Sequence, residues 1–404
     1  MEVLHERCAG LDVHKDMVQA CARIGTGKAG RELQRFGTTT PELLRLSDWL
    51  RERGVTHVVM EATGVYWKPV WNVLADDFEL VLANAQHVKA VPGRKSDVND
   101  ATWLAELLAH GLVRGSFVAP QPQQELRDLT RTRKQMTREV SRLTQRLQKV
   151  LEDANVKLSS VVSDVLGEAP RRILEAIIAG ETDPSKLVEL RGKLRGAPES
   201  LHAALTGRVT EHHRFMLRLH LEQIDAIDRG IAEIERRIER QLEPFRESIE
   251  RLTTIPGVSK TIAHVVVAEI GLDMSRFPTH PQLLSWAGLC PRQDESAGKV
   301  RSTRVRHGNT WLKTDLCQAA LAAMRAKGTY LQAQFHRIRS RRGIKKAIVA
   351  IAGSILCAAY HILLHGQPYR DLGPDHLDRR EPGRALRRLT KRAEALGYTL
   401  VKAA

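Results

Sequence analysis

The order of strand-like and helix-like segments in the first 110 or so residues is the strongest constraint on the fold. Residues 8–13, 17–24 and 30–36 are short apolar or alternating runs, and Gly25, Gly27 and Gly30 mark tight turns, which is typical of an antiparallel meander of three strands. The segments that follow predict helix, strand, helix, strand and helix at residues 40–53, 57–61, 66–75, 79–83 and 97–110. Thr40 and Ser96 are the expected caps of the first and last helices, with Pro41 at the first helical position.

This order, βββαβαβα, predicts an RNase H-like α/β fold for residues 1–115. In mixed α/β sheets the site forms at the carboxyl ends of the central strands. Asp12 and Glu61 both stand where predicted strands end. Asp97 and Asp100 are three residues apart at a predicted helix start, so both lie on one helical face.

Four converging carboxylates would repel one another, and divalent cations remove that penalty. Oxygen-only ligands suit Mg²⁺ or Mn²⁺, and two such ions can hold the attacking and leaving oxygens of a phosphodiester. Taken singly, each acid has an ordinary alternative as a loop residue or as a favourable charge at a helix N-terminus. As a set on this strand order, Asp12, Glu61, Asp97 and Asp100 favour metal binding.

Residues 116–250 change character to long, charged helices. Apolar residues recur at three- and four-residue steps in two seams, which predicts a helical coiled-coil or dimerisation arm; an intramolecular helical bundle is equally compatible. The seams are Leu129, Met136, Val140, Leu143, Leu147 and Val150, then Ile224, Ile227, Ile231, Ile234 and Ile238. Glycines and Pro198 between them predict two helical stretches joined by a bent insert.

Residues 251–404 form a third, mostly helical region. Residues 255–258 (IPGV) before a helix from Ser259 suggest a helix-hairpin-helix-like turn for DNA contact, although a plain loop has the same pattern. The apolar stretch 347–364 is interrupted by Ser354 and His361, which favours a buried core helix over a membrane span. Residues 291–309 are predicted to be a polar, basic loop.

Charge indicates the partner class. The chain has 404 residues with 63 Lys and Arg against 47 Asp and Glu, and residues 331–404 alone hold 15 basic and 5 acidic side chains. Such an excess favours nucleic acid as partner. The five cysteines are widely spaced and form no CxxC pair, and the N-terminus is polar, so a reducing cytoplasm is expected.

The predicted loop carries a second set of candidates. Ser296 could attack a phosphodiester, or it could simply contact a phosphate, since no general base is evident nearby. The candidate nucleic-acid contacts around it are Lys299, Arg301, Arg304, Arg306, Asn309 and Lys313.

Several of these segments resemble a known family. Residues 10–15 (GLDVHK), 60–64 (MEATG) and 95–101 (KSDVNDA) resemble the acidic motifs of the bacterial DEDD insertion-sequence transposases related to the Piv DNA invertase. Near the C-terminus, the matching motifs are residues 255–258, 287–291 (AGLCP), 295–299 (ESAGK) and 308–309 (GN). The arm matches in helical character alone.

The resemblance implies a RuvC-like domain whose tetrad Asp12, Glu61, Asp97 and Asp100 binds Mg²⁺, and a nucleophile at Ser296. It also implies a structured non-coding guide RNA, donor and target DNA, and assembly as a dimer or tetramer. Ala297 departs from the glycine that many members carry, so Ser302 is the fallback nucleophile.

We therefore expect a cytoplasmic, nucleoid-associated recombinase that cleaves and exchanges DNA strands through a covalent serine intermediate. One rival is a RuvC-like structure-selective endonuclease in which the tetrad activates water and Ser296 only binds phosphate. Another is a non-enzymatic architectural binder, which gives the four acids no role.

Overall fold

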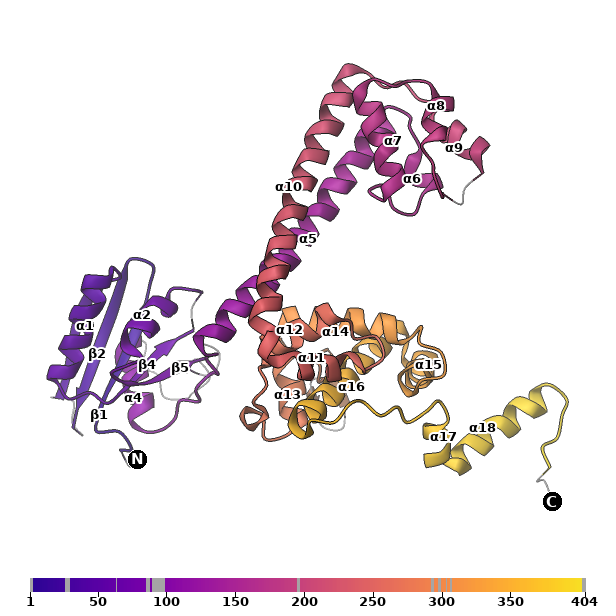
Figure 1. Cartoon of the computed structure of the whole chain (residues 1–404). Helices are drawn as coiled ribbons and strands as arrows, with labels where there is room; N and C mark the ends of the chain where they lie inside the picture. The colour runs from indigo at the N-terminus through magenta and orange to yellow at the C-terminus, as the bar shows by residue number, and fades with distance from the viewer. Residues whose placement is uncertain are drawn as a thin grey trace. The chain divides into compact units, whose positions relative to one another are not determined.

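The computed structural model describes residues 3–25, 30–62, 64–84, 88, 99–194, 197–291, 294–296, 299–302, 304–305 and 307–401. The chain divides into two compact units, Met1–Pro120 and Gln121–Ala404. Each unit is described by itself below, with the element labels of Figure 1.

The N-terminal unit is built on a mixed five-stranded sheet. Its strands are β1 (Arg7–Val13), β2 (Met17–Ile24), β3 (Arg31–Gly37), β4 (His57–Glu61) and β5 (Glu79–Ala83), in the order β3-β2-β1-β4-β5. The pairs β1–β2 and β2–β3 are antiparallel, which confirms the predicted meander, whereas β1–β4 and β4–β5 are parallel. β1 is therefore the central strand, next to both kinds of neighbour.

Helices cover both faces of this sheet. α1 (Thr40–Glu52) and α2 (Trp67–Leu74) pack on the face that carries Leu11 and Met60. α4 (Asp100–Ala109) packs on the opposite face, with Cys8 and Val59. The result is a three-layer arrangement in which one residue in two along β1 points toward α4.

The predicted caps of two helices are wrong. α1 has Thr39, not Thr40, at its N-cap, and no side chain caps it. α4 begins at Asp100 with Asn99 at the N-cap, and the Asn99 side chain accepts a hydrogen bond from the Ala101 amide at 2.9 Å. Ser96 and Asp97 lie outside the described residues. Asn99 takes the cap because asparagine is as good a capping residue as serine and stands directly before the apolar run of α4.

Two long helices form the arm of the second unit. α5 (Gln121–Asp153) and α10 (Glu211–Leu242) pack along each other (Figure 1). They approach closely at Gly230, where a side chain would meet Met136. The bent insert consists of α6 (Leu158–Val161), α7 (Glu168–Ala179), α8 (Pro184–Glu189) and α9 (Pro198–Leu205). Seam residues Leu143, Leu147 and Ile224 share one buried cluster with the insert, so within the chain the seams pack as a helical bundle.

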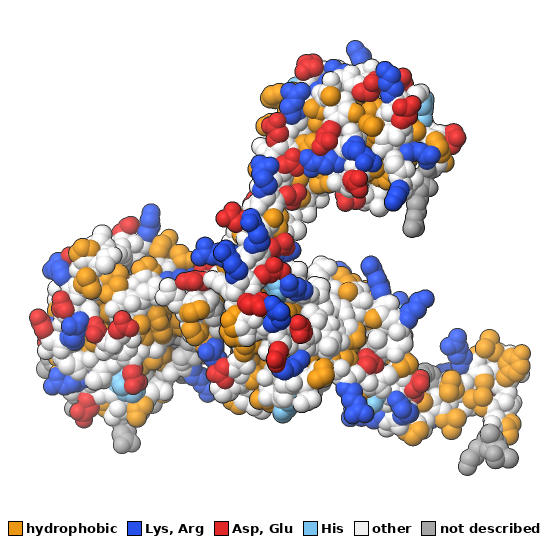
Figure 2. Space-filling view, viewed as in Figure 1, with side chains coloured by type: hydrophobic (Ala, Val, Ile, Leu, Met, Phe, Trp, Pro, Cys, Tyr) orange, Lys and Arg blue, Asp and Glu red, His pale blue; other side chains and the backbone are white. Residues whose placement is uncertain are grey.

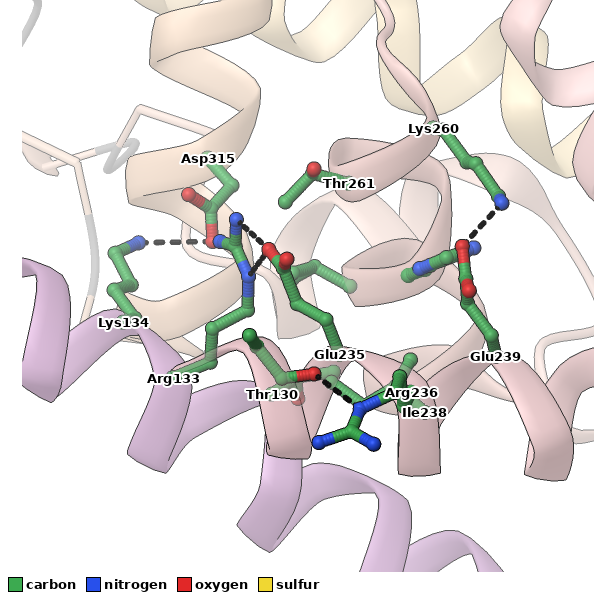
Figure 3. Close-up of a pocket in the computed structure, with 13 residues that line it drawn as sticks. Thr130, Arg133, Lys134, Glu235, Arg236, Ile238, Glu239, Lys260, Thr261 and Asp315 are labelled. Atoms are coloured by element: carbon green, nitrogen blue, oxygen red, sulfur yellow. Dashed lines mark hydrogen bonds and ion pairs between the residues drawn. The ribbon is translucent and has the colours of Figure 1, made fainter. Parts of the chain in front are cut away.

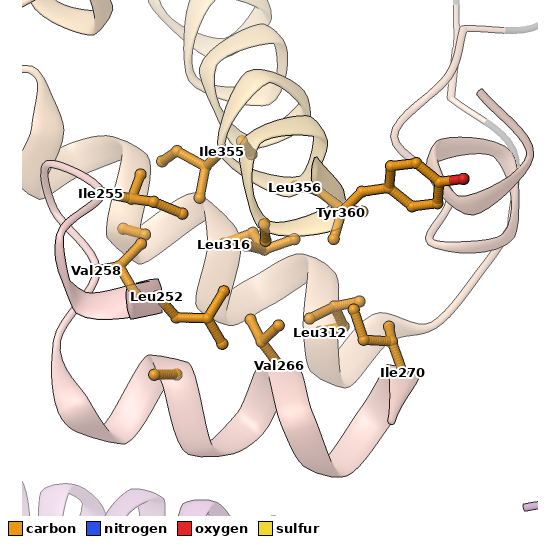
Figure 4. Close-up of a cluster of buried hydrophobic side chains, with 14 of the residues drawn as sticks. Leu252, Ile255, Val258, Val266, Ile270, Leu312, Leu316, Ile355, Leu356 and Tyr360 are labelled. Carbon is orange, nitrogen blue, oxygen red and sulfur yellow. The ribbon is translucent and has the colours of Figure 1, made fainter. Parts of the chain in front are cut away.

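The remaining elements are the helices of a second hydrophobic core, a two-stranded hairpin and two C-terminal helices whose described residues take no part in that core. They are η2 (Glu243–Phe245), α11 (Arg246–Thr253), α12 (Lys260–Ile270), η3 (Met274–Arg276), α13 (His280–Trp286), β6 (Asp294–Ser296), β7 (Lys299–Ser302), α14 (Thr310–Ala323), α15 (Tyr330–Arg342), α16 (Ile344–His365), α17 (His376–Arg380) and α18 (Pro382–Ala395). Figure 4 shows Leu252, Val266 and Leu316 converging with residues of α16 in this core.

α16 is the one helix of the described residues that is long and apolar enough to cross a membrane. Ile351, Ile355 and Leu356 on it are completely buried against the neighbouring helices of the core. The prediction of a buried core helix is thus confirmed for this face of α16.

Candidate active site

Asp12 and Glu61 lie side by side in the strand register. β1 and β4 are parallel, and Leu11 is opposite Met60 in the last aligned pair. Asp12 and Glu61 each come one residue later, near the carboxyl ends of adjacent central strands. The sequence-based expectation that these strand ends meet is therefore fulfilled by the register.

The close approach of α4 to β1 shows which way these side chains point. A Cβ on Gly10 would lie 2.2 Å from the Ala101 carbonyl oxygen and 2.5 Å from the Ala105 nitrogen, so only glycine fits there. Because side chains alternate along a strand, Asp12 faces the same side as Gly10. Val59 packs with Leu104 in one cluster, so Glu61 also faces α4.

The start of α4 lies at the same edge of the sheet. Cys8 Sγ donates to the Ala105 carbonyl at 3.5 Å, whereas Gly10 also meets Ala101, one turn closer to the helix start. α4 thus runs antiparallel to β1, and its first residue, Asp100, is at the end where Asp12 stands. Three of the four predicted acids share this edge, which we call the acidic edge (Asp12, Glu61 and Asp100). Asp97 lies outside the described residues.

The acidic edge offers oxygen donors that solvent can reach. The Asp12 side chain is 27% exposed, and its Oδ2 lies 3.1 Å from His14 Nε2. Asp100 is exposed and Glu61 is half-buried. Carboxylates alone are the donors that Mg²⁺ and Mn²⁺ prefer, so the donor set fits these ions, and the helix N-terminus adds favourable positive potential for anionic groups.

Ser296 lies on a hairpin, where the sequence predicted an irregular loop. β6 and β7 pair antiparallel, with Ser296 opposite Lys299 and Asp294 opposite Ser302. An isolated bridge between Pro291 and Val305 extends the pairing toward the base. Residues 297 and 298 between the strands include a glycine, which is the signal for a two-residue hairpin that the sequence reading missed.

The two candidate serines occupy opposite ends of this hairpin. Ser296 is the last residue of β6, next to the turn, and its side chain lies outside the described part. Ser302 ends β7, and its Oγ accepts a hydrogen bond from the Arg304 amide at 3.3 Å.

The base of the hairpin is fixed by close backbone contacts between two family-like motifs. A Cβ on Gly308 would lie 2.3 Å from the Gly288 nitrogen, and the Asn309 amide donates to the Trp286 carbonyl at 3.3 Å. Gly308 therefore has a structural reason to lack a side chain.

Both polar atoms of the Asn309 side chain form hydrogen bonds. Its Oδ1 accepts from the amides of Trp311 and Leu312 at 3.1 and 3.0 Å, which caps α14, and its Nδ2 donates to Glu269 Oε2 at 2.6 Å. In this structure its side chain ties the end of the hairpin to α12.

Glu269 is a residue that the sequence reading missed. It is completely buried, and Arg131 binds it through two hydrogen bonds of 2.8 Å, with Arg127 Nε 3.6 Å away. Burial lowers the pKa of Arg127, while the Glu269 carboxylate acts in the opposite direction. A single acid in an otherwise apolar helix (residues 262–270) was the available signal, since such a charge requires a partner.

The predicted basic contacts differ in exposure. Lys299 and Arg304 are exposed, and Lys313 is half-buried. Arg306 and the side chain of Arg301 lie outside the described part. Figure 2 shows further Lys and Arg side chains distributed over the C-terminal helices, and α15 alone contributes Arg337, Arg339, Arg341 and Arg342.

The predicted helix-hairpin-helix-like turn connects α11 to α12. Gly257 has a φ of 88°, and a Cβ there would lie 2.3 Å from the Ala319 carbonyl oxygen of α14. Ile255 and Val258 are buried in the same core. One side of the turn therefore packs against α14. Ser259, which follows the turn, caps α12 through its hydroxyl.

A cavity of about 380 Å³ lies between the arm and the helical core (Figure 3). Three of its four Lys and Arg side chains pair with acids, and the fourth, Arg236, bonds the Ala232 carbonyl. Arg133 binds Glu235 at 2.6 Å, Lys134 binds Asp315 at 2.8 Å and Lys260 binds Glu239 at 2.5 Å. Since most of the positive charge is paired within the cavity, little excess positive potential remains to bind a phosphate backbone, and we do not take this cavity as the candidate site.

Two family models match the chain. A model for the DEDD transposases of the IS110 family, described as "Transposase", matches residues 9–156, and a model described as "Transposase IS116/IS110/IS902 family" matches residues 249–336. The first contains the acidic edge, and the second contains the hairpin with Ser296 together with Glu269 and Asn309.

Three curated relatives are each similar over about 30% of this chain. A putative transposase of Sinorhizobium fredii is 26% identical over 129 residues, which is 31% of this chain and 33% of the relative. An uncharacterised 43.6 kDa protein of insertion element IS110 from Streptomyces coelicolor is 30% identical over 127 residues, 30% of each chain. The pilin gene-inverting protein of Moraxella bovis is 31% identical over 122 residues, 29% of this chain and 37% of the relative.

The chain thus spans about a third of the length of the curated relatives that it matches. The two family models match at separate places, one at each candidate site. On these matches, the chain carries both transposase domains of the IS110 family.

Proposed function

We propose that the chain is a transposase or recombinase that cleaves and rejoins DNA strands with Mg²⁺ or Mn²⁺ at the acidic edge and Ser296 as nucleophile. The observation that carries the proposal is the strand register, which places Asp12 and Glu61 near the carboxyl ends of adjacent strands, with Asp100 at the start of the helix that packs on β1. The strand order and this edge support an RNase H-like, RuvC-like assignment of the first unit.

Asp12, Glu61 and Asp100, with Asp97, would hold the metal. When bound, the ion supplies positive charge that stabilises a phosphodiester during displacement. The carboxylates themselves hold and orient the site, and the rigid β1–α4 contact at Gly10 fixes their spacing.

Ser296 would carry the cleaved strand. Its hydroxyl oxygen attacks the phosphorus, one P–O bond of the strand breaks, and the serine proton ends on the leaving strand oxygen. The phosphodiester energy is kept in the serine ester, so a strand hydroxyl can reverse the step and rejoin DNA without another cofactor. Lys299, which is exposed opposite Ser296 on the hairpin, and Arg304, which is exposed at its base, would neutralise phosphate charge.

The proposed partners are nucleic acids and further copies of this chain. The basic C-terminal helices would bind the backbones of donor and target DNA and of a structured guide RNA. The arm would join two or four copies through its exposed surfaces. A soluble protein that acts on the bacterial chromosome would work in the cytoplasm.

A denaturing gel tests the serine step. Wild type, Ser296→Ala and Ser302→Ala are expressed with the native flanking DNA, and protein-linked DNA is sought in Mg²⁺. We expect an adduct with wild type and with Ser302→Ala, and none with Ser296→Ala. Cleaved DNA without an adduct in any of the three would instead identify a water-using endonuclease. Sequencing of co-purified nucleic acid tests the guide, which should appear as one discrete RNA.

A further inference from the structure

Three side chains of the helical core form a separate group of metal-ligand type. His280 is the first residue of α13, and Cys357 and His361 lie one turn apart on α16. One ligand atom from each of these three residues lies within 4.8 Å of the other two. His280 and Cys357 are half-buried and His361 is exposed, so the group is open to solvent on one side.

We propose that His280, Cys357 and His361 bind a Zn²⁺ ion. Imidazole nitrogen and thiolate sulfur are the usual donors of Zn²⁺, whereas Mg²⁺ and Mn²⁺ prefer oxygen. On a tetrahedral Zn²⁺ with bonds of about 2.0–2.3 Å, neighbouring ligand atoms lie roughly 3.5 Å apart. Small rotations of three side chains would therefore close the present group around an ion, with water in the fourth position.

The backbones that carry the ligands are firmly held. The Tyr360 hydroxyl donates to the Phe277 carbonyl at 2.9 Å, which joins α16 to the segment just before α13. Leu283 of α13 is completely buried in the same core as α16. The rings of His280 and His361 are already neighbours, with centroids 5.4 Å apart. Metal binding would therefore require little further ordering of the backbones of α13 and α16.

The ion would brace the part of the fold that holds the serine hairpin. α13 ends at Trp286, whose carbonyl accepts the Asn309 amide at the base of that hairpin. A bond network from α16 through the ion to α13 would therefore limit movement of the hairpin base. This site is distinct in residues and in donor type from the acidic edge, and it does not depend on the proposed recombinase activity.

Metal content and spectroscopy of the full-length chain test the proposal. After incubation with Zn²⁺ and dialysis, we expect one equivalent of Zn²⁺ per chain by elemental analysis. Replacement by Co²⁺ should give the absorption of a tetrahedral cobalt site together with a thiolate-to-cobalt charge-transfer band. EDTA should lower the unfolding temperature of the loaded protein.

Variants show which residues bind. Cys357→Ser should remove the thiolate band, and His361→Ala should weaken Zn²⁺ binding at least about 100-fold. His361 is exposed, so this variant is expected to fold even if Cys357→Ser does not. Cys317→Ser and His336→Ala, which remove a half-buried thiol and an exposed imidazole elsewhere in the same unit, should bind like wild type.

The proposal is overturned by a wild-type chain that retains no Zn²⁺, or by a cobalt form without a thiolate band. It is equally overturned if Cys357→Ser and His361→Ala both bind like the controls. Asp12→Asn should bind Zn²⁺ like wild type. The test of the Zn²⁺ site is therefore independent of the test of the acidic edge.

Discussion

The regions near the two ends of α4 contain carboxylates of nearly equal exposure in different surroundings. Near the end of the helix, the Glu106 side chain is 28% exposed and lies 2.6 Å from Arg31 and 3.5 Å from Arg23. At its start, the Asp12 side chain is 27% exposed and shares the acidic edge with Glu61 and Asp100. Exposure alone therefore does not distinguish the two places; the neighbouring groups do.

The two regions differ in the charged groups that surround the carboxylate. At Glu106 the chain supplies guanidinium groups, and Arg23 is itself almost completely buried beside the carboxylate. At the acidic edge the register and the direction of α4 place Glu61 and Asp100 on the side of Asp12, whose Oδ2 lies 3.1 Å from His14 Nε2, and carboxylates are donors that Mg²⁺ and Mn²⁺ prefer. Glu269 extends the comparison, since a fully buried acid takes two arginines and an asparagine.

The largest expected effect is on activity at the acidic edge. Asp12→Asn removes a metal-binding charge with little change of shape, so we expect strand cleavage to fall by about 10²–10³-fold or more. The free energy of unfolding should stay within about 1 kcal/mol of wild type, or rise, because one of several like charges is gone. Adduct formation measures strand cleavage, and urea unfolding measures the free energy of unfolding. If Asp12→Asn is both stable and fully active, the acidic edge does not have the metal-binding role that distinguishes it from Glu106.

The next effect is on stability at Glu269. Glu269→Ala leaves buried arginine charge without its carboxylate, which should cost about 3–5 kcal/mol of unfolding free energy. Glu269→Gln, which keeps the shape and a hydrogen-bond acceptor, is the matched control and should lose less. Equilibrium unfolding in urea gives both values, and equal losses would mean that packing rather than charge dominates at this position.

Glu106 sharpens the comparison within one helix. Glu106→Gln weakens the bonds to Arg31 and Arg23, so we expect a loss of about 1–2 kcal/mol in thermal or urea unfolding. Strand cleavage by the folded variant should equal that of wild type. A drop in cleavage like that of Asp12→Asn would show that the two ends of α4 do not differ as proposed.

The smallest effect is at the helix caps. Asn99→Ala removes the hydrogen bond to the Ala101 amide and should cost about 1 kcal/mol. Thr39→Ala should change stability by less than about 0.5 kcal/mol, because the Thr39 side chain makes no capping bond. Paired thermal melts of the two variants check this order.

The sequence predicted the elements of the first unit well because most of the strands have an apolar pattern and Gly25, Gly54 and Gly64 mark turns between elements. It predicted the meeting of Asp12 with Glu61, since the carboxyl ends of parallel strands share an edge. It misplaced the start of α4, because Ser96 and Asn99 are both good capping residues and only tertiary packing chooses between them.

The second unit was harder to predict from sequence. The hairpin around Ser296 is too short for an alternating pattern to be visible, and its base depends on contacts between Gly288 and Gly308 that lie far apart in the chain. His280 joins Cys357 and His361 only through the packing of α13 on α16, although the spacing of the latter two on one helix was visible.

Mn²⁺ binding to the acidic edge is the most direct test of the central claim. Titration of the full-length chain, followed by the paramagnetic resonance of free Mn²⁺, should show binding by wild type and by Glu106→Gln. Asp12→Asn should bind at least about tenfold more weakly, since a carboxylate ligand is lost. Equal affinity of Asp12→Asn and wild type, or no binding by wild type, would contradict the account.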